Sequence, residues 1–209
     1  MKNIYEPADK VIRELNRRNL KAFGKLKTAK WDELNVIRQV DTVYEDSIRM
    51  AKQRYYEMAV EVYIVALYEA GVDKVKATQM ADDHITRDWI LQWLTEVDPV
   101  TLYAFLPEAE RKKQRLMEAL VWARNRNAEI DKALRYWSKQ LGQYAINLTD
   151  YARIDAFKAA GISEVIWETE NDELVCEYCE PLDGKVFPII AVPAKKHLNC
   201  RCHLVPVLN

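Results

Sequence analysis

The chain has 209 residues, 49% of them hydrophobic and 30% charged, which suffices for the core of one or two domains and excludes a disordered tail. Its 31 basic and 32 acidic residues leave a net charge of −1, so no global field draws the protein to nucleic acid or to an anionic membrane, and any DNA contact must be local. The longest apolar run, residues 62–68, is far shorter than the roughly 20 residues that span a bilayer.

The N-terminal sequence and the glycine content indicate the class of protein. MKNIYEPADK contains no apolar signal region, so we expect a soluble protein made in a cytoplasm. Only five glycines occur, which provides little turn chemistry for a many-stranded sandwich. We therefore predict a mainly α protein whose first 150 residues are mostly helical.

Two helices are predicted in the N-terminal third. Pro7 suits a first helical position, and an apolar stripe predicts a helix over residues 7–21, followed by a basic link at 24–30. A much longer helix is predicted from Asp32 until Gly71 stops it, because apolar residues recur at steps of three and four. The first stripe consists of Val11, Leu15 and Leu20, and the second of Ile37, Val40, Tyr44, Ile48, Ala51, Tyr55, Met58 and Val62.

The middle of the chain is more broken, and a second long helix follows it. We place Ile85, Trp89 and Trp93 on one helical face that Asp98-Pro99 closes, and Pro107 opens a further helix containing Leu116 and Leu120. Another stripe predicts a long helix ending at Gly161: Ile130, Leu134, Trp137, Leu141, Tyr144, Leu148 and Tyr151. The two long helices are expected to pack antiparallel in an elongated body, with their aromatic residues in the helix–helix core.

One basic cluster precedes the second long helix. It consists of Arg111, Lys112, Lys113, Arg115, Arg124 and Arg126. Acidic residues such as Glu110 and Glu118 are interleaved with it. We therefore interpret the cluster as a solvated face, with local DNA contact as the lesser alternative.

A change of period at Ser163 marks a second domain. Val165, Trp167 and Thr169 alternate with Ile166 and Glu168, which is a strand pattern. We divide the chain into a helical domain at 1–162 and a C-terminal module at 163–209. Asp183-Gly184 is a two-residue hairpin-turn signal before the strand-like residues 185–190, so we predict a small β-hairpin module in an α+β protein.

All four cysteines lie in this module. CEYC is followed after 17 residues by HLNCRCH. A C-x-x-C turn points two thiolates to one side, and two ligands from a distant segment complete a tetrahedron, so we predict a structural zinc ion with no position left for a reactive water. Six potential ligands are present: Cys176, Cys179, His197, Cys200, Cys202 and His203.

Four ligands are needed, and the second pair must be chosen. We favour His197 and Cys200, whose H-x-x-C spacing can make a second knuckle, because Cys200 and Cys202 would sit too far apart on a strand unless the backbone bends. Cys202 is kept as a reserve ligand, and both Cys202 and His203 could instead be plain strand residues. A disulfide, a thioredoxin-like redox pair and chance clustering are the other interpretations, and each is less favoured.

Four stretches occur in a fixed order: WETEND at 167–172, CEYC at 176–179, LDGKVF at 182–187 and HLNCRC at 197–202. Together they resemble the C-terminal signature of the phage Mu protein F-like family of head morphogenesis proteins. The resemblance is close in this segment and only general in the helices. Leu198 stands where members usually have proline. Residues 194–196 stand where members have a segment richer in proline before the motif histidine. Many relatives are also longer.

The resemblance implies a minor capsid protein of a tailed bacteriophage, present in few copies. It implies a place inside the virion at the portal vertex after assembly in the host cytoplasm, and a role in head assembly and in DNA packaging or ejection. The implied partners are the portal protein and scaffold or capsid proteins. From the residues themselves, which show no evident active site and no long apolar stretch, we expect no enzymatic activity, no small-molecule substrate and no membrane association.

Two enzymatic alternatives remain open at this point. A zinc-ribbon nucleic-acid-binding protein or a His-Asn-His nuclease could use Asp183, His197, Asn199 and His203, although His197 is better used as a zinc ligand. The pair Glu168 and Glu170 matches the Glu-x-Glu of ADP-ribosylating toxins, some of which are fused to related phage-head domains. The chain has no obvious Ser-Thr-Ser segment for nicotinamide, which disfavours that reading.

Overall fold

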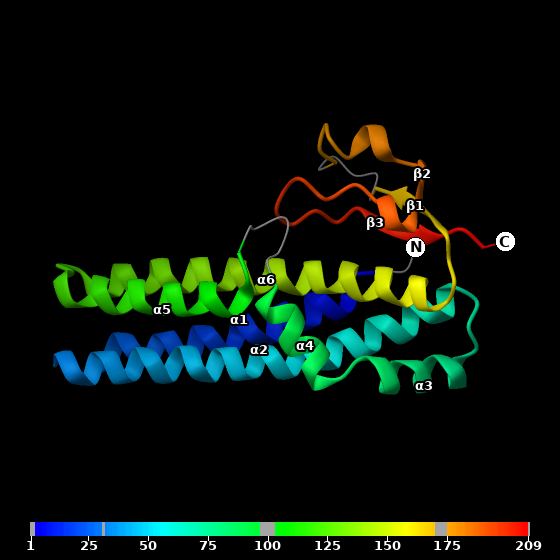
Figure 1. Cartoon of the computed structure of the whole chain (residues 1–209). Helices are drawn as coiled ribbons and strands as arrows, with labels where there is room; N and C mark the ends of the chain where they lie inside the picture. The colour runs from blue at the N-terminus through cyan, green and yellow to red at the C-terminus, as the bar shows by residue number, and fades with distance from the viewer. Residues whose placement is uncertain (1–2, 31, 97–102, 170–174, 209) are drawn as a thin grey trace.

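The computed structural model describes residues 3–30, 32–96, 103–169 and 175–208. It shows an elongated bundle of helices with a small antiparallel sheet lying against one side of it (Figure 1). The predicted mainly α fold with a small β part at the C-terminal end is confirmed. None of the described helices combines the length and the apolar character needed to cross a membrane.

The first two helices form the N-terminal hairpin of the bundle. α1 spans Glu6–Thr28 and α2 spans Glu33–Glu69. Asp32 caps α2 as predicted, because its side chain accepts a hydrogen bond of 2.9 Å from the Asn35 N–H. The end of α2 was also predicted correctly, since Gly71 follows it with φ of +86°.

Two expectations for α1 were wrong. The helix continues through Gly24 and most of the predicted basic link, because nothing in that link breaks a helix. Leu20 is 64% exposed and does not belong to the buried stripe. It follows Leu15 by five residues, whereas one turn of helix places Asn19 and then Phe23 on the buried side.

Two short helices, α3 (Lys74–His84) and α4 (Arg87–Thr95), pack beside the C-terminal half of α2 (Figure 1). Ile85 does not share a helix with Trp89 and Trp93, which corrects the predicted common face. The chain breaks there because the Thr86 side chain accepts from the Trp89 N–H at 3.1 Å and starts a new helix. The predicted Asp98-Pro99 stop lies outside the described residues.

The last two helices are α5 (Phe105–Trp122) and α6 (Arg126–Ala159). Asn125 caps α6 through a hydrogen bond of 3.1 Å from the Ala128 N–H. Gly161 follows the helix with φ of +79°, as its position predicted. Of the predicted stripe on α6, Tyr151 is 41% exposed, whereas Trp137, Leu141 and other members are buried.

The two long helices are parallel, not antiparallel as predicted. The indole N–H of Trp137 donates to the Ser47 hydroxyl at 2.7 Å. Several turns further along both helices, Arg153 of α6 pairs with Glu69 of α2 at 2.8 Å. Residue numbers therefore rise together along α2 and α6. The chain can join two parallel helices because α3, α4 and α5 bring it back to the starting end of the bundle (Figure 1).

α1 and α5 run against the two long helices. Lys27 of α1 pairs with Asp131 of α6 at 2.5 Å, near the end of one helix and the start of the other. Lys113, in the middle of α5, pairs with Asp41, in the first half of α2, at 2.6 Å. The ring of Phe105, at the start of α5, packs on Tyr55, further along α2, so these two helices also run in opposite directions. The bundle core lies between the four helices and is rich in packed rings, among them Tyr44, Tyr55, Phe105, Trp137 and Tyr144. The predicted role of these aromatic residues is confirmed.

The C-terminal sheet has three strands in the order β2-β1-β3, and both pairings are antiparallel. Its strands are β1 (Glu164–Glu168), β2 (Val186–Pro188) and β3 (His203–Pro206). The predicted hairpin within the spacer is wrong, because β2 pairs with β1 and not with a strand adjoining Asp183-Gly184. That dipeptide still turns, since the Lys185 N–H donates to the Leu182 carbonyl at 3.0 Å.

Two glycines in contrasting conformations give a matched test of this fold. Gly24 lies inside α1 with open space where a Cβ would stand, so Gly24→Ala should stabilise the protein by about 0.4 to 1 kcal/mol. Gly161 has a positive φ, so Gly161→Ala should cost about 1 kcal/mol. Urea unfolding of both variants measures this. Shifts of the same sign would contradict these backbone assignments.

Candidate metal centre

The first half of the site is a tight turn between β1 and β2. The Cys179 N–H donates to the Cys176 carbonyl at 2.9 Å and lies 3.3 Å from the Cys176 sulfur, so the turn holds both thiols at one side. A single turn of 3-10 helix at Glu180–Leu182 follows. The sequence folds this way because Pro181 cannot donate a backbone hydrogen bond and suits the start of a short helix.

The second half of the site is the loop that leads into β3. Asn199 adopts a left-handed conformation with φ of +59°, which asparagine tolerates better than most residues and which reverses the chain after His197. The Asn199 N–H donates to the Gln143 side chain of α6 at 2.6 Å. This hydrogen bond fixes the loop against the helical bundle.

The two halves meet at Cys179. Its sulfur lies 3.8 Å from Nε2 of His197 and 3.6 Å from the sulfur of Cys200. The ligand atoms of Cys176, Cys179 and His197 all lie within 4.8 Å of one another, and so do those of Cys179, Cys200 and Cys202. Five of the predicted ligands thus form two overlapping groups that share one buried thiol, and these groups could hold a metal ion.

The strand argument against Cys202 does not hold in the structure. Cys200 and Cys202 precede β3 and are not in a regular strand, so their sulfurs approach each other despite the spacing of two residues. His203 is different, because it is a residue of β3 that is paired with Glu168 across the sheet. Its Nε2 lies 3.4 Å from the Glu168 carboxylate and it belongs to neither group.

The four thiols form a cluster that suits a cation. All four are free, and only Cys176 is not fully buried. Burial raises the pKa of the Cys179 thiol to about 12, whereas the hydrogen bond from Cys202 and the charge of Lys195 lower the pKa of Cys200 to about 5. The thiols of the cluster therefore differ in how readily they lose a proton. A soft divalent cation would stabilise further thiolates here, which is the donor chemistry that zinc prefers.

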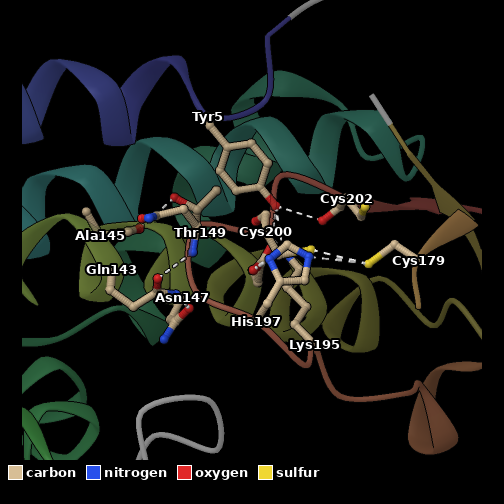
Figure 2. A network of polar contacts seen from close by, with 12 residues as sticks. Tyr5, Gln143, Ala145, Asn147, Thr149, Cys179, Lys195, His197, Cys200 and Cys202 are labelled. Carbon is tan, nitrogen blue, oxygen red and sulfur yellow. Dashed lines mark hydrogen bonds and ion pairs between the residues drawn. The ribbon is translucent and has the colours of Figure 1, made fainter. Parts of the chain in front are cut away.

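A buried polar network fastens the second loop to the bundle (Figure 2). The Tyr5 hydroxyl donates to Asp150 of α6 at 2.7 Å and approaches the Cys202 carbonyl at 3.0 Å. The Lys195 ammonium donates to the other Asp150 oxygen at 2.5 Å, to the Tyr5 hydroxyl at 2.7 Å and to the Cys200 carbonyl at 3.3 Å. The backbone that carries two candidate ligands is thereby tied to residues at both ends of the sequence.

Two further contacts attach this loop and β3 to the helices. Arg201 pairs with Asp9 of α1 at 2.7 Å, and its guanidinium lies over the Tyr5 ring at 5.1 Å. Arg153 of α6 is buried and donates to the Leu204 carbonyl at 2.9 Å. The C-terminal segment therefore contacts α1 and α6 on both sides of the thiol cluster.

Sequence reasoning missed the residues of this network. Tyr5 and Asp150 are 145 positions apart, and nothing in the sequence indicates that they meet. One usable signal exists on α6, where buried polar residues interrupt an apolar helix: Gln140, Gln143, Thr149 and Arg153. Buried polar side chains need partners, so they indicate that a polar segment packs there.

The residues proposed for the enzymatic alternatives do not gather at a second site. The Asp183 carboxylate accepts from the backbone and the hydroxyl of Thr169 at 2.8 and 3.0 Å, which is a structural role beside β1. His197 lies in the thiol cluster and His203 pairs with Glu168. Glu170, the second residue of the Glu-x-Glu pair, lies outside the described residues.

Residues 112–205 match the family model described as Phage Mu protein F like protein. The match runs from α5 through α6 and ends in β3, so it contains every candidate ligand. This segment, less than half of the chain, is similar to the phage Mu protein F-like family. No curated protein and no solved structure shows a significant match to the chain.

The family match agrees with the predicted resemblance and extends it into the helices. The phage Mu protein F-like segment includes α6, which supplies Gln143, Asp150 and Arg153 to the loop contacts described above. α1 to α4 precede the matched segment. This similarity points to a phage head morphogenesis protein.

Proposed function

We propose that this protein is a minor capsid component of a tailed bacteriophage that acts in head morphogenesis at the portal vertex. It assembles in the host cytoplasm, remains inside the virion and contributes to DNA packaging or ejection as a structural protein, not as an enzyme. The observation that supports this proposal most strongly is the family match, which covers the thiol cluster together with the helix on which the cluster rests.

We further propose that the cluster holds one structural zinc ion. Cys176, Cys179, His197 and Cys200 are its ligands, and Cys202 remains a reserve ligand close to Cys179. In this arrangement the ion fastens a metal-dependent module at 163–209 to the helical domain at 1–162. A module with three short strands has little core of its own, so metal binding supplies most of its folding free energy.

A protein partner on the helices is supported by exposed aromatic side chains. Trp122, at the end of α5, is 85% exposed, and Tyr136 of α6 is 55% exposed. Exposed aromatic residues are the usual anchors of protein interfaces. The portal protein is the proposed partner, with scaffold or capsid proteins as further contacts.

A pull-down with the portal protein encoded by the same genome tests this function. The full chain should retain the portal protein. The variants Trp122→Ala and Cys179→Ser test whether the helices or the C-terminal module bind it. Loss with Trp122→Ala alone assigns binding to the helices, and loss with Cys179→Ser alone assigns it to the module. Failure of the unaltered, zinc-loaded chain to retain the portal protein would contradict the proposal.

A further inference from the structure

A groove on the α1–α2–α4 side of the bundle differs from the rest of the protein in its charge. It has a volume of about 1130 Å³ and is lined by α1, α2 and the start of α4. Seven of its fourteen lining residues are lysine or arginine, and Asp46 is the one acidic residue among them. The whole chain has a net charge of −1, so folding gathers positive charge here from separate parts of the sequence.

Most of these cations have no counter-charge in the protein. Within the described part of the chain, five groove residues make no ion pair within 4.0 Å: Arg17, Lys21, Lys25, Lys52 and Arg87. The other two are Arg18, paired with Glu14 at 3.0 Å, and Arg49, paired with Asp46 at 2.5 Å. The groove therefore has an excess of solvated cationic side chains without an acidic partner among the described residues.

The basic cluster at residues 111–126 differs from the groove in its ion pairs. On α5, Arg111 and Lys112 both pair with Glu108, and Lys113 pairs with Asp41 and Glu110. Three of the six cations of that cluster are therefore paired with acidic residues of the protein. The α1–α2–α4 groove gathers five unpaired cations in one hollow, so an external anion meets more uncompensated positive charge there than at the α5 cluster.

The density of charge indicates the class of ligand. Residues 17–25 of α1 span about 12 Å at a rise of roughly 1.5 Å per residue. Duplex DNA carries about seven phosphate charges over that length, at one per roughly 1.7 Å, whereas an extended peptide has about four residues at roughly 3.3 Å each. Four of the seven cations of the groove lie on this stretch of α1, and the other three line the same groove from α2 and α4. Together they match the charge density of a nucleic-acid backbone better than that of an acidic peptide.

The groove offers few strongly exposed apolar anchors to a protein partner, since Met50 and Tyr56 in its lining are half-buried. Leu91, at 41%, is its one strongly exposed large apolar residue among those described. We propose that the α1–α2–α4 groove binds the phosphodiester backbone of nucleic acid without reading its base sequence. Lysine and arginine contacts to phosphates supply affinity and position but carry no sequence information.

This inference is independent of the proposed zinc site and of portal binding. The C-terminal sheet lies over α6, whereas α2 and α4, which line the groove, lie on the other side of the bundle (Figure 1). The groove residues also precede the segment matched by the family model. A groove variant should therefore retain zinc and portal binding.

The test is fluorescence anisotropy of the full, zinc-loaded chain with a labelled 20-base-pair duplex DNA at salt concentrations from 50 to 200 mM. With about four phosphate contacts, the affinity should fall roughly 100-fold over this range. Arg17→Glu combined with Lys21→Glu should weaken binding at 50 mM at least tenfold and reduce the salt slope by about 2.

The matched control is Lys74→Glu combined with Lys76→Glu, which changes the net charge equally at two exposed positions on α3. It should bind DNA within about threefold of the unaltered chain, because a general charge effect is small at these salt concentrations. Circular dichroism confirms that both variants fold. Single-stranded DNA and duplex RNA should also bind, and polyglutamate should not.

Three results would overturn the proposal. They are absence of duplex binding at 50 mM salt, equal weakening by the groove and α3 variants, and tighter binding of polyglutamate than of DNA. The last result would assign the groove to an acidic protein. Portal binding by the same samples keeps a failure of this inference distinct from a failure of the proposed function.

Discussion

Cys179→Ser is expected to abolish stoichiometric zinc binding and to release the C-terminal sheet from the bundle. Cys179 is the one residue shared by both groups of candidate ligands, and its sulfur lies within 4 Å of both His197 and Cys200. Structural zinc contributes roughly 10 to 16 kcal/mol of apparent binding free energy in zinc-finger peptides. Three short strands cannot compensate for such a loss.

Hydrogen exchange of the full chain measures this effect segment by segment. Backbone amides of β1 and β3 should lose protection in Cys179→Ser, whereas those in the buried parts of α2 and α6 should keep it. Glu177→Gln is the matched control, because this exposed residue lies in the same turn and in neither ligand group. Unchanged protection of the sheet in Cys179→Ser would show that the metal is not needed to hold it.

Asp150→Ala is expected to destabilise the protein by about 3 kcal/mol while leaving the zinc ligands in place. The carboxylate of Asp150 accepts from Tyr5 and pairs with Lys195, whose side chain is only 13% exposed. Removing one member of a buried charge pair leaves the other without compensation, which costs roughly 3 to 5 kcal/mol. The lower end applies because Lys195 retains the Tyr5 hydroxyl and the Cys200 carbonyl as acceptors.

Urea unfolding gives this free energy, and a second aspartate on α6 provides the control. Asp131 pairs with Lys27 at 2.5 Å, but its side chain is 48% exposed. Asp131→Ala should therefore cost less than about 1 kcal/mol. Equal losses in the two variants would contradict the structural importance assigned to the Tyr5–Asp150–Lys195 network.

Local signals in the sequence predicted the helices well. Asp32 caps α2, and Gly71 and Gly161 end the two long helices, because each of these residues acts through its own backbone or its nearest neighbours. The same kind of signal placed the first strand after Ser163. Such features depend on a few adjacent residues and can be read before the fold is known.

The arrangement of the helices could not be predicted in the same way. An apolar stripe shows which face of a helix is buried but not the direction of the helix that covers it. α2 and α6 carry similar stripes and are parallel, because the direction depends on the three helices between them. The charge of the α1–α2–α4 groove could not be predicted from the sequence for a related reason. The groove combines Arg17, Lys52 and Arg87 from three separate helices.

The sequence predicted that the cysteine thiols and His197 lie close together, but not how their loops attach to the bundle. The spacing of Cys176, Cys179, His197 and Cys200 indicated the cluster because both knuckles are local turns. The argument that set Cys202 aside assumed a regular strand, and the bend around Asn199 removes that assumption. Tyr5 and Asp150 were missed because a contact across 145 positions leaves no local pattern.

X-ray absorption at the zinc edge of the purified full chain tests the central claim most directly. A structural site formed by Cys176, Cys179, His197 and Cys200 should give one zinc ion per chain, with three sulfur neighbours at about 2.3 Å and one nitrogen at about 2.0 Å. Four sulfur neighbours would mean that Cys202 is a ligand in place of His197, and the ion would still join the two loops of the site. A chain without stoichiometric zinc, or zinc surrounded by oxygen alone, would contradict the account.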